Sequence, residues 1–340
     1  METPILVNSA DPLRSCAELP INKTGQTILG RDKAKAETKN RRNPGPSWGY
    51  RFLRVTDKVA PEWLYKPLRA IGTAIAMAGM PAQRAHSRAY LEIMLGRRVG
   101  LLDIFRHFFA FEEALMLKLR IANGRDIPCR YAPGSDDCRE WMEHGGAVLL
   151  GSMHVGVSDM LGVQIGSMHQ RQVFLVRQRV ENSHDTEEIE SRFGRFVKFI
   201  WVNDPGDVLF ALKDAASTEY AIAMQCDRLE HSSRSEVFMF LGKNRRFPFT
   251  IYHLAILFCR PVLLSVGTSS AAGHSIVHSS PRFELIEGED RAQALARARE
   301  HFQAFLRLVE EVLRQNPYVW FNFVPLNSVE EDVCNERRKR

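Results

Sequence analysis

The sequence predicts an α/β protein with a mainly parallel sheet sandwiched between helices and a helical layer on its amino-terminal side. Two observations carry this prediction. From about residue 147 onward, short apolar runs rich in β-forming residues alternate with amphipathic segments, and the runs are apolar enough to be covered on both faces. Before them, residues 48–143 place large apolar side chains at helical spacing. With 340 residues, 45% of them hydrophobic, the chain can bury a full core.

The chain divides into an arm, one domain and a tail. Residues 1–46 are polar and end in KAETKNRRNPGPS, which is typical of a flexible arm. Residues 47–327 form the predicted domain, with a helical part at 47–143 and an α/β part at 144–327. In the helical part, HSRAYLEIMLG and LLDIFRHFFAFEEALMLKLRIANG are expected helices, and Gly124 closes the second. Residues 328–340 are a charged tail.

The α/β part contains six expected strands and a long final helix. The strands are AVLLGSM (147–153), QVFLVR (172–177), FVKFIWV (196–202), YAIAMQ (220–225), VFMF (237–240) and PVLLSVG (261–267). The helix is expected over about 291–315, and it precedes the aromatic segment NPYVWFNFVP.

Composition excludes several classes of protein. The six cysteines form no CxxC pair, so neither a zinc knuckle nor a disulfide framework is indicated, and a reduced, cytoplasmic setting fits best. The opening residues METPILVNSADPLRSC lack the pattern of a secretory signal. The uncharged stretch at 70–83 is shorter than the roughly 18 to 20 apolar residues of a membrane-spanning helix. We therefore expect neither export nor a transmembrane segment.

Positive charge is concentrated near the start of the domain. The net charge is +6, and residues 51–98 carry nine Lys or Arg against three acids. Apolar residues recur at helical spacing within this segment at Leu64, Leu68, Ile71, Ile75 and Ala78. Such a basic amphipathic helix fits an anionic membrane surface, or it packs on its own domain. Nucleic acid is a third reading of the charge, but no recognisable nucleic-acid-binding module accompanies it.

A histidine followed five positions later by an acid occurs three times, where chance supplies about 1.3 such pairs. The pairs are His107 with Glu112, His154 with Asp159, and His231 with Glu236. The first lies within a helical pattern, where five residues turn through about 140° and separate the two side chains. The third lies in a polar loop, RLEHSSRSE. Only the second follows a buried strand, where α/β sheets place their active sites.

His154 is therefore the candidate general base. A strand-to-helix turn can bring Asp159 onto the imidazole, and a histidine so oriented can take a proton from an alcohol through Nε2. A serine hydrolase would need G-x-S-x-G, which Gly151-Ser152-Met153-His154 does not match. Cys226 could be a thiol nucleophile, although an isolated cysteine after a strand is more typical of a core.

Further charged residues follow the expected strands. Arg177 ends one strand, and Asp227 and Arg228 follow another, so all three are expected at the crevice edge of a parallel sheet. The segment VFMFLGKNRRFPFT then joins an apolar run, Gly242 and a basic turn, a mixture suited to an acyl chain beside a phosphate-rich group. Taken singly, these residues also fit a surface ion pair, a turn residue and a solvated loop.

Together these blocks resemble the bacterial lipid A biosynthesis lauroyl/myristoyl acyltransferases and the related phosphatidylinositol mannoside acyltransferases, within the glycerolipid acyltransferase superfamily. The resemblance covers about residues 48–325. The matching features are the H-x4-D/E box at His154 and Asp159, Arg177 with Asn182, Asp227 after its strand, the block FMFLGKNRRFPFT, and the ending NPYVWFNFVP. The chain departs from the family in lacking an amino-terminal hydrophobic anchor, and in carrying Asp159 where glutamate is more frequent.

The resemblance implies an acyltransferase that needs no metal or cofactor. It would move a fatty acyl group from acyl-carrier protein or acyl-CoA onto a hydroxyl of a lipid or glycolipid, either lipid A-like or another envelope lipid. His154 would be the general base and Asp159 its orienting acid. Substrate-binding roles would fall to Arg177, Asn182, Asp227, Arg228 and Gly242. The enzyme would attach peripherally to the cytoplasmic face of the inner membrane.

Two other functions remain open from the sequence. A thioesterase or other hydrolase would use the same His154 and Asp159 to activate water. A catalytically inactive protein of this fold would bind lipid at a membrane surface.

Overall fold

The computed structural model describes residues 55–57, 61–125, 127–162, 171–178, 191, 193–203, 208–230, 232, 234–270 and 273–326. Its helices are α3 (Glu62–Ala78), α4 (Pro81–Leu95), α5 (Leu101–Ala122), α6 (Asp136–His144), the 3-10 helix η3 (Ser158–Met160), α9 (Val208–Ala216), α10 (Thr250–Phe258) and α11 (Arg291–Gln315). Its strands are β1 (Cys129–Tyr131), β2 (Leu149–Ser152), β3 (Val173–Arg177), β4 (Val197–Trp201), β5 (Ala221–Gln225), β6 (Ser235–Phe240), β7 (Lys243–Pro248), β8 (Val262–Ser269) and β9 (Ser275–Ser279).

The central sheet is mainly parallel. It has seven strands in the order β1-β9-β8-β2-β5-β3-β4, and every neighbouring pair is parallel except β8 with β9. Helices alternate with these strands along the chain, as the sequence pattern predicted, and the predicted α/β class is confirmed. The order also sets β2 directly beside β5, which brings the residues that follow these two strands to one edge.

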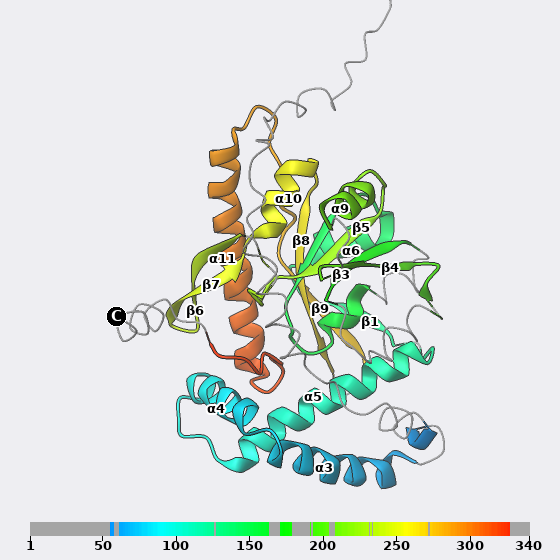
Figure 1. The fold of residues 1–340 in the computed structure, drawn as a ribbon, viewed down its shortest axis with the longest axis vertical. Helices are drawn as coiled ribbons and strands as arrows, with labels where there is room; N and C mark the ends of the chain where they lie inside the picture. The colour runs from blue at the N-terminus through cyan, green and yellow to red at the C-terminus, as the bar shows by residue number, and fades with distance from the viewer. Residues whose placement is uncertain are drawn as a thin grey trace, which may run out of the picture. The chain divides into compact units, whose positions relative to one another are not determined.

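Both faces of the sheet are buried, as the apolar strands indicated. Successive residues of β2 point into different clusters, with Leu149 packed among α9, α10 and α11 and Leu150 packed with α6. The same alternation holds in β8, where Leu264 joins the first cluster and Leu263 the second. Figure 1 shows α10 and α11 together on one side of the sheet. A strand covered on both sides is expected to be almost continuously apolar, and residues 262–266 of β8 are apolar except for Ser265.

The segment that follows β5 departs from the prediction. VFMF lies within β6, which pairs with β7 in a separate two-stranded hairpin and not with the central sheet. The basic residues expected in a turn form β7 instead. The turn itself is the two residues Leu241 and Gly242, both with positive φ (50° and 71°), the backbone that a tight two-residue hairpin requires. The short strands β1 and β9 were also not predicted.

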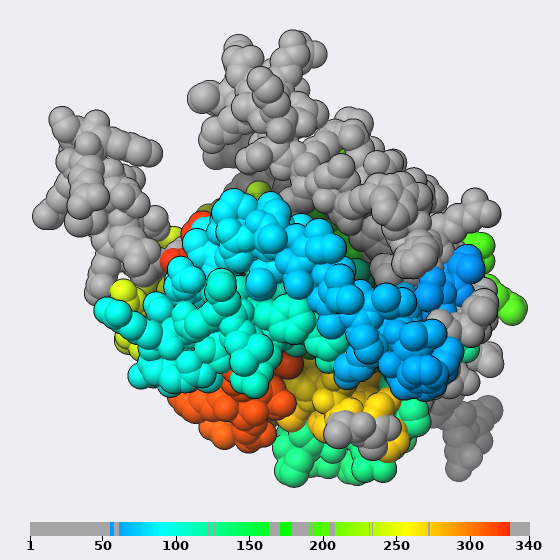
Figure 2. All heavy atoms as spheres, turned by 90° about the horizontal axis from the view of Figure 1, so that it is seen from below, coloured from blue at the N-terminus to red at the C-terminus, as the bar shows by residue number. Residues whose placement is uncertain are grey.

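The helices α3, α4 and α5 form the amino-terminal layer, and Figure 2 shows them on one face of the molecule. In α3 the apolar face of the helix is exposed, and the polar face is buried. Its apolar side chains are 47% to 76% exposed at Trp63, Leu64, Leu68, Ile71 and Ile75. Its buried side chains are Tyr65, Arg69 and Thr73. The predicted helix is present, but its apolar face does not pack on the rest of the domain.

Arg69 shows how the polar face of α3 can be buried. Its guanidinium donates to Glu62 at 2.6 Å and to Glu112 of α5 at 2.9 Å. It also lies over the ring of Tyr65, 5.3 Å from the centroid. A buried charge is tolerated when it is paired and hydrogen-bonded in this way.

Among the helices that the structure describes, none is both long enough and apolar enough to cross a membrane.

Candidate active site

The site begins at the loop that follows β2, and glycines fix the path of this loop. A Cβ on Gly151 would lie 2.3 Å from the side chain of Leu264, so only glycine fits there. Gly156 has a φ of +52°, and a Cβ on it would lie 2.4 Å from the carbonyl oxygen of Gly267. Both close approaches hold the intervening His154 at the carboxyl edge of the sheet.

Asp227 is the acid that contacts His154. The imidazole Nδ1 lies 2.7 Å from one carboxylate oxygen of Asp227, and the backbone N–H of His154 donates to the other at 2.9 Å. Asp227 follows β5, whose Gln225 is in register with Ser152 of β2, so the parallel pairing of the two strands brings acid and base together. The Asp227 side chain is fully buried, whereas that of His154 is 19% exposed.

The protonation states follow from these contacts. Burial raises the pKa of Asp227, but the charge of His154 when it is protonated, the hydrogen bonds from His154 and the charge of Arg228 outweigh that effect and hold the pKa at about 2. Asp227 is therefore a carboxylate at neutral pH, which can only accept hydrogen bonds. Nδ1 of a neutral imidazole must then carry the proton, and Nε2 is left as the proton acceptor.

Asp159 does not occupy the expected place against the imidazole. It lies in η3, is exposed, and accepts a hydrogen bond from the side chain of Gln225 at 2.6 Å. The preceding Ser158 is buried and accepts from the N–H of Gly267 at 2.8 Å, which fixes the turn before Asp159. Desolvation raises the pKa of Asp159, but the charge of His154 when it is protonated and the charges of Lys118 and other basic groups outweigh it and lower the pKa.

The other residues that the sequence predicted for the site are Arg177, Arg228, Gly242 and Asn182. Arg177 ends β3, with its guanidinium 5.8 Å from the ring centroid of Phe199. Arg228 directly follows Asp227 and donates to the carbonyl oxygen of Phe321 at 3.5 Å. Gly242 is an exposed residue of the β6–β7 turn, where its positive φ is a requirement of the hairpin. Asn182 lies outside the described residues.

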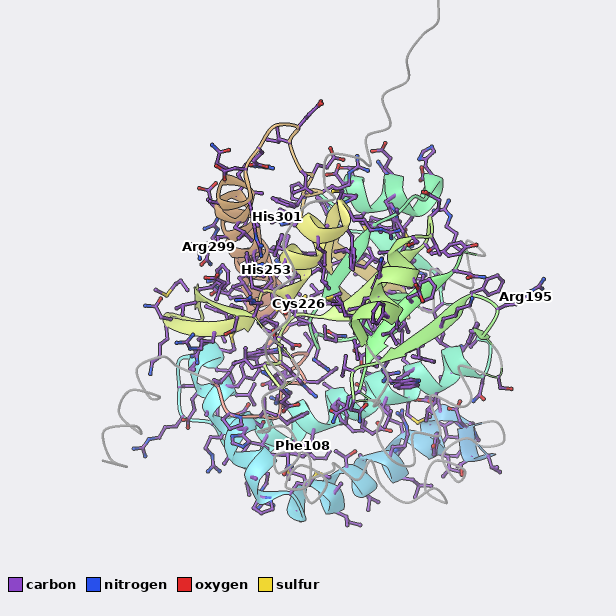
Figure 3. All side chains as sticks on the ribbon, turned by 45° about the horizontal axis from the view of Figure 1, so that its top comes forward. Phe108, Arg195, Cys226, His253, Arg299 and His301 are labelled. Carbon is purple, nitrogen blue, oxygen red and sulfur yellow. The ribbon has the colours of Figure 1, made fainter. Side chains whose placement is uncertain are left out.

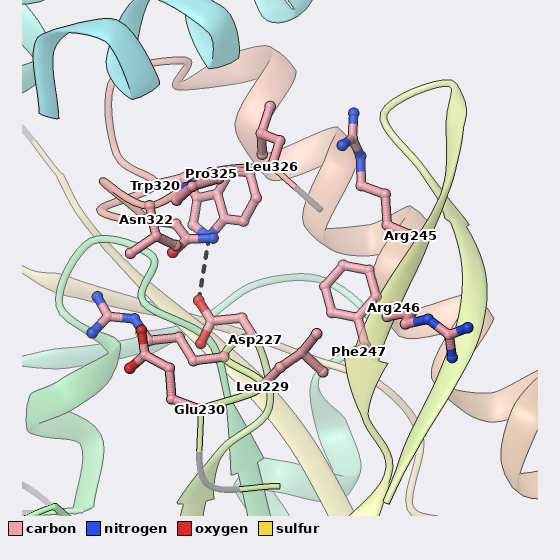
Figure 4. Close-up of a pocket in the computed structure, with 12 residues that line it drawn as sticks. Asp227, Leu229, Glu230, Arg245, Arg246, Phe247, Trp320, Asn322, Pro325 and Leu326 are labelled. Carbon is pink, nitrogen blue, oxygen red and sulfur yellow. Dashed lines mark hydrogen bonds between the residues drawn. The ribbon is translucent and has the colours of Figure 1, made fainter. Parts of the chain in front are cut away.

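A pocket of about 240 Å³ opens beside Asp227 (Figure 4). Its wall combines apolar side chains with basic ones. The lining residues are Asp227, Arg228, Leu229, Glu230, Arg245, Arg246, Phe247, Trp320, Asn322, Val324, Pro325 and Leu326. Two buried polar atoms in this wall, Nε of Arg228 and Oδ1 of Asn322, have no hydrogen-bond partner among the described residues. Buried polar atoms are normally satisfied, so a polar ligand group in the pocket would complete them.

Cys226 is a core residue. Its thiol is buried in the cluster that also contains residues of α10 and α11, and Figure 3 labels the residue within the domain. Burial, with the neighbouring charge of Asp227, raises the thiol pKa to about 12. A thiol with that pKa is protonated at neutral pH and is not a nucleophile.

Two residues at the site carried no signal of this role in the sequence. Trp320 donates from Nε1 to Asp227 at 3.3 Å, and His107 reaches the carbonyl oxygen of Trp320 at 2.9 Å. Trp320 was visible only as part of an aromatic ending, and His107 only as a helical residue. Their contacts span 93 and 213 positions of the chain, which no local pattern records.

No protein-family model and no curated protein matches the chain. Among solved structures, the chain is similar to the 1-acyl-sn-glycerophosphate (LPA) acyltransferase PlsC from Thermotoga maritima. The TM-score is 0.38 at 9% sequence identity, and the match covers 72% of this chain and 97% of that chain. The proposal of a function therefore rests on the geometry of the site itself.

Proposed function

We propose that this protein is an acyltransferase that moves a fatty acyl group from an acyl thioester to a hydroxyl of a lipid or glycolipid. The observation that carries the proposal is the hydrogen bond from Nδ1 of His154 to the buried carboxylate of Asp227. It holds the imidazole in the tautomer whose Nε2 accepts a proton, on a side chain that remains partly exposed.

The reaction needs only this base and an activated donor. Nε2 of His154 removes the proton of the acceptor hydroxyl while its oxygen attacks the thioester carbonyl. The C–S bond then breaks, and the thiolate leaves with the proton that the imidazolium returns. The Asp227 carboxylate orients the ring and stabilises the imidazolium, a function the sequence resemblance had given to Asp159. Asp159 contributes negative charge near the ring from a position outside hydrogen-bonding contact with it.

The pocket beside Asp227 supports a donor or acceptor with both apolar and phosphate groups. Leu229, Phe247 and Leu326 offer apolar surface, and Arg228 supplies a guanidinium with an unsatisfied Nε. Arg177, at the end of β3, adds positive charge near Asp159. Acyl-carrier protein and acyl-CoA both present a phosphate-bearing arm, and either is a suitable donor. The acceptor is a lipid A-like molecule or another envelope lipid.

We propose further that α3 attaches the enzyme peripherally to an anionic membrane surface, at the cytoplasmic face of the inner membrane. Its exposed apolar side chains, from Trp63 to Ile75, lie in a segment with an excess of basic residues. Apolar insertion and attraction to anionic lipids are the two contributions that bind such helices to bilayers.

Vesicle sedimentation tests the attachment. The double variant Ile71→Glu/Ile75→Glu removes two exposed apolar side chains and adds two negative charges. Binding to vesicles that contain phosphatidylglycerol should fall at least tenfold, since each lost apolar contact and each added negative charge is worth about 1 kcal/mol. Ile286→Glu, at an apolar residue that is 58% exposed outside α3, is the matched control and should bind normally. Equal binding by all three proteins would contradict the attachment.

Mass spectrometry tests the reaction. Purified protein is incubated with acyl-CoA or with acyl-carrier protein, each with and without a lipid extract. We expect an acylated lipid with the wild type and none with His154→Ala, whose circular dichroism should match the wild type. Release of free fatty acid irrespective of acceptor would show a thioesterase instead. Lipid binding without turnover, or full activity in His154→Ala, would overturn the proposal.

A further inference from the structure

The segment that follows α11 folds back over the proposed active site. Its backbone pairs with the loop that carries the base: the N–H of Phe321 donates to the carbonyl oxygen of His154, and the N–H of Gly156 donates to that of Val319, both at 2.7 Å. Trp320 lies between them, in an antiparallel bridge with Val155. This loop is therefore held by the end of the domain as well as by the sheet.

The side chain of Trp320 fixes the carboxylate of Asp227. The indole Nε1–H donates to one oxygen of this carboxylate (Figure 4). The same oxygen accepts from the backbone N–H of His154, and the other oxygen is left for Nδ1. Trp320 is 2% exposed. Its ring meets Tyr90 of α4 and Phe240 of β6 edge to face, at centroid distances of 5.1 and 5.4 Å. The rings leave the indole little freedom to turn.

The carbonyl oxygen of Trp320 is in turn held by the helical layer. His107 of α5 contacts it through Nε2 at 2.9 Å, and Ser87 of α4 contacts Nδ1 of His107 at 2.9 Å. A carbonyl oxygen can only accept, so Nε2 carries the proton and Nδ1 accepts from the hydroxyl of Ser87. Ser87 and His107 are each 1% exposed, so water does not compete for these bonds.

We propose that Trp320 is a positioning residue for the His154–Asp227 pair, and that His107 holds Trp320 in place from the helical layer. The proposal rests on the proposed function, because it takes His154 as the base. The hydrogen bonds run without interruption from Ser87 through His107, Trp320 and Asp227 to the imidazole. Acyl transfer consequently depends on the packing of α4 and α5 against the end of the domain.

Trp320→Phe tests the first part, because it keeps an aromatic ring and removes the Nε1–H donor, although the ring is also smaller than indole. We expect kcat to fall about tenfold, which corresponds to the loss of one hydrogen bond to a charged group. When Trp320→Phe is introduced into the Asp227→Asn variant, it should lower kcat no further, because Trp320 acts through that carboxylate. Trp141→Phe is the matched control: it removes a buried indole donor to the carbonyl oxygen of Gly146 and should leave kcat unchanged.

His107 provides a second test that does not touch the indole. His107→Gln keeps a donor for Trp320 and an acceptor for Ser87, and should retain kcat within about threefold, whereas His107→Leu should lose about tenfold. If Trp320→Phe fails to fold, the comparison of the two His107 variants tests the proposal. The proposal is overturned by a kcat of Trp320→Phe within twofold of the wild type, by additivity with Asp227→Asn, or by equal kcat in the two His107 variants. Each of these results, combined with an inactive His154→Ala, would leave the proposed acyltransferase function standing.

Discussion

Strand β8 and helix α3 place their apolar residues in opposite ways. Residues 262–268 of β8 are buried in succession and pack into clusters on both faces of the sheet. In α3 the apolar face is exposed and the buried face carries Arg69 and Thr73. Apolar periodicity therefore predicts the type of each element correctly, but only for β8 does it also predict what is inside. In α3 the same periodicity marks a surface that is available to something other than this domain.

Charge explains the difference. Arg69 is buried because Glu62 of the same helix and Glu112 of α5 approach it within 2.9 Å, so an ion pair joins α3 to α5. The sheet is stabilised mainly by apolar burial. The two regions should consequently respond to different substitutions.

The largest effect is expected from breaking the ion pairs of α3. Arg69→Met leaves the Glu112 carboxylate without its guanidinium, whereas Glu62 keeps its pair with Arg120, and should lower the free energy of unfolding by about 3–5 kcal/mol. Lys66→Met, which removes a more exposed pair with Glu113, should cost no more than about 1 kcal/mol. Urea denaturation of both variants measures the difference. Equal small losses would mean that α3 is not held by buried charge.

In β8 the corresponding test is a substitution that creates a cavity in the core. Leu264→Ala removes a fully buried side chain and should cost about 2–5 kcal/mol of unfolding free energy. Ile75→Ala, in the 70% exposed position of α3, should change it by less than about 0.5 kcal/mol. A loss above 2 kcal/mol for Ile75→Ala would show that this face is packed within the protein after all.

His107 is a third kind of buried group, polar and neutral, within the helical layer. Burial lowers its pKa from 6.5 to about 4. Between these values the unfolded chain binds more protons than the folded one, so stability falls as pH falls through this window, by about 3 kcal/mol in all. His107→Gln should lack this contribution. Urea titrations between pH 7 and 4 should therefore show the wild type losing stability faster, and parallel curves would contradict a buried neutral His107.

The smallest expected effect concerns the hairpin turn. Gly242→Ala places a Cβ at a φ of +71° and should cost about 1 kcal/mol of unfolding free energy. Acyl transfer by the folded variant should be unchanged, because Gly242 lies in the turn and is not among the residues that line the pocket. A large loss of kcat without a loss of stability would restore Gly242 to the substrate-binding role expected from the sequence.

Local sequence patterns predicted most of the fold. The strands β2, β3, β4, β5 and β8 were predicted because their runs are mainly apolar, and α11 because its period is regular over 25 residues. The sequences CRY, KNRRFP and SIVHS were missed because each is polar or very short, and their strand geometry depends on neighbours distant in the chain.

The sequence predicted which residues belong to the site better than it predicted which of them contact each other. His154 and Asp227 were both recognised as residues that follow buried strands. Spacing favoured Asp159 because it is only five positions away, whereas Asp227 is 73 positions away and reaches the imidazole only through the register of β2 with β5. Which strands become neighbours is a property of the whole sheet, and single-sequence patterns do not encode it.

The choice between the two acids is the central claim, and one kinetic comparison tests it. Asp227→Asn and Asp159→Asn are equally conservative changes, so kcat for acyl transfer can be measured side by side in folded proteins. The structure predicts a loss of about 10²–10⁴ for Asp227→Asn, because the imidazolium loses its carboxylate, and a loss of less than about tenfold for Asp159→Asn. The reverse order, with Asp159→Asn inactive and Asp227→Asn close to wild type, would contradict the account.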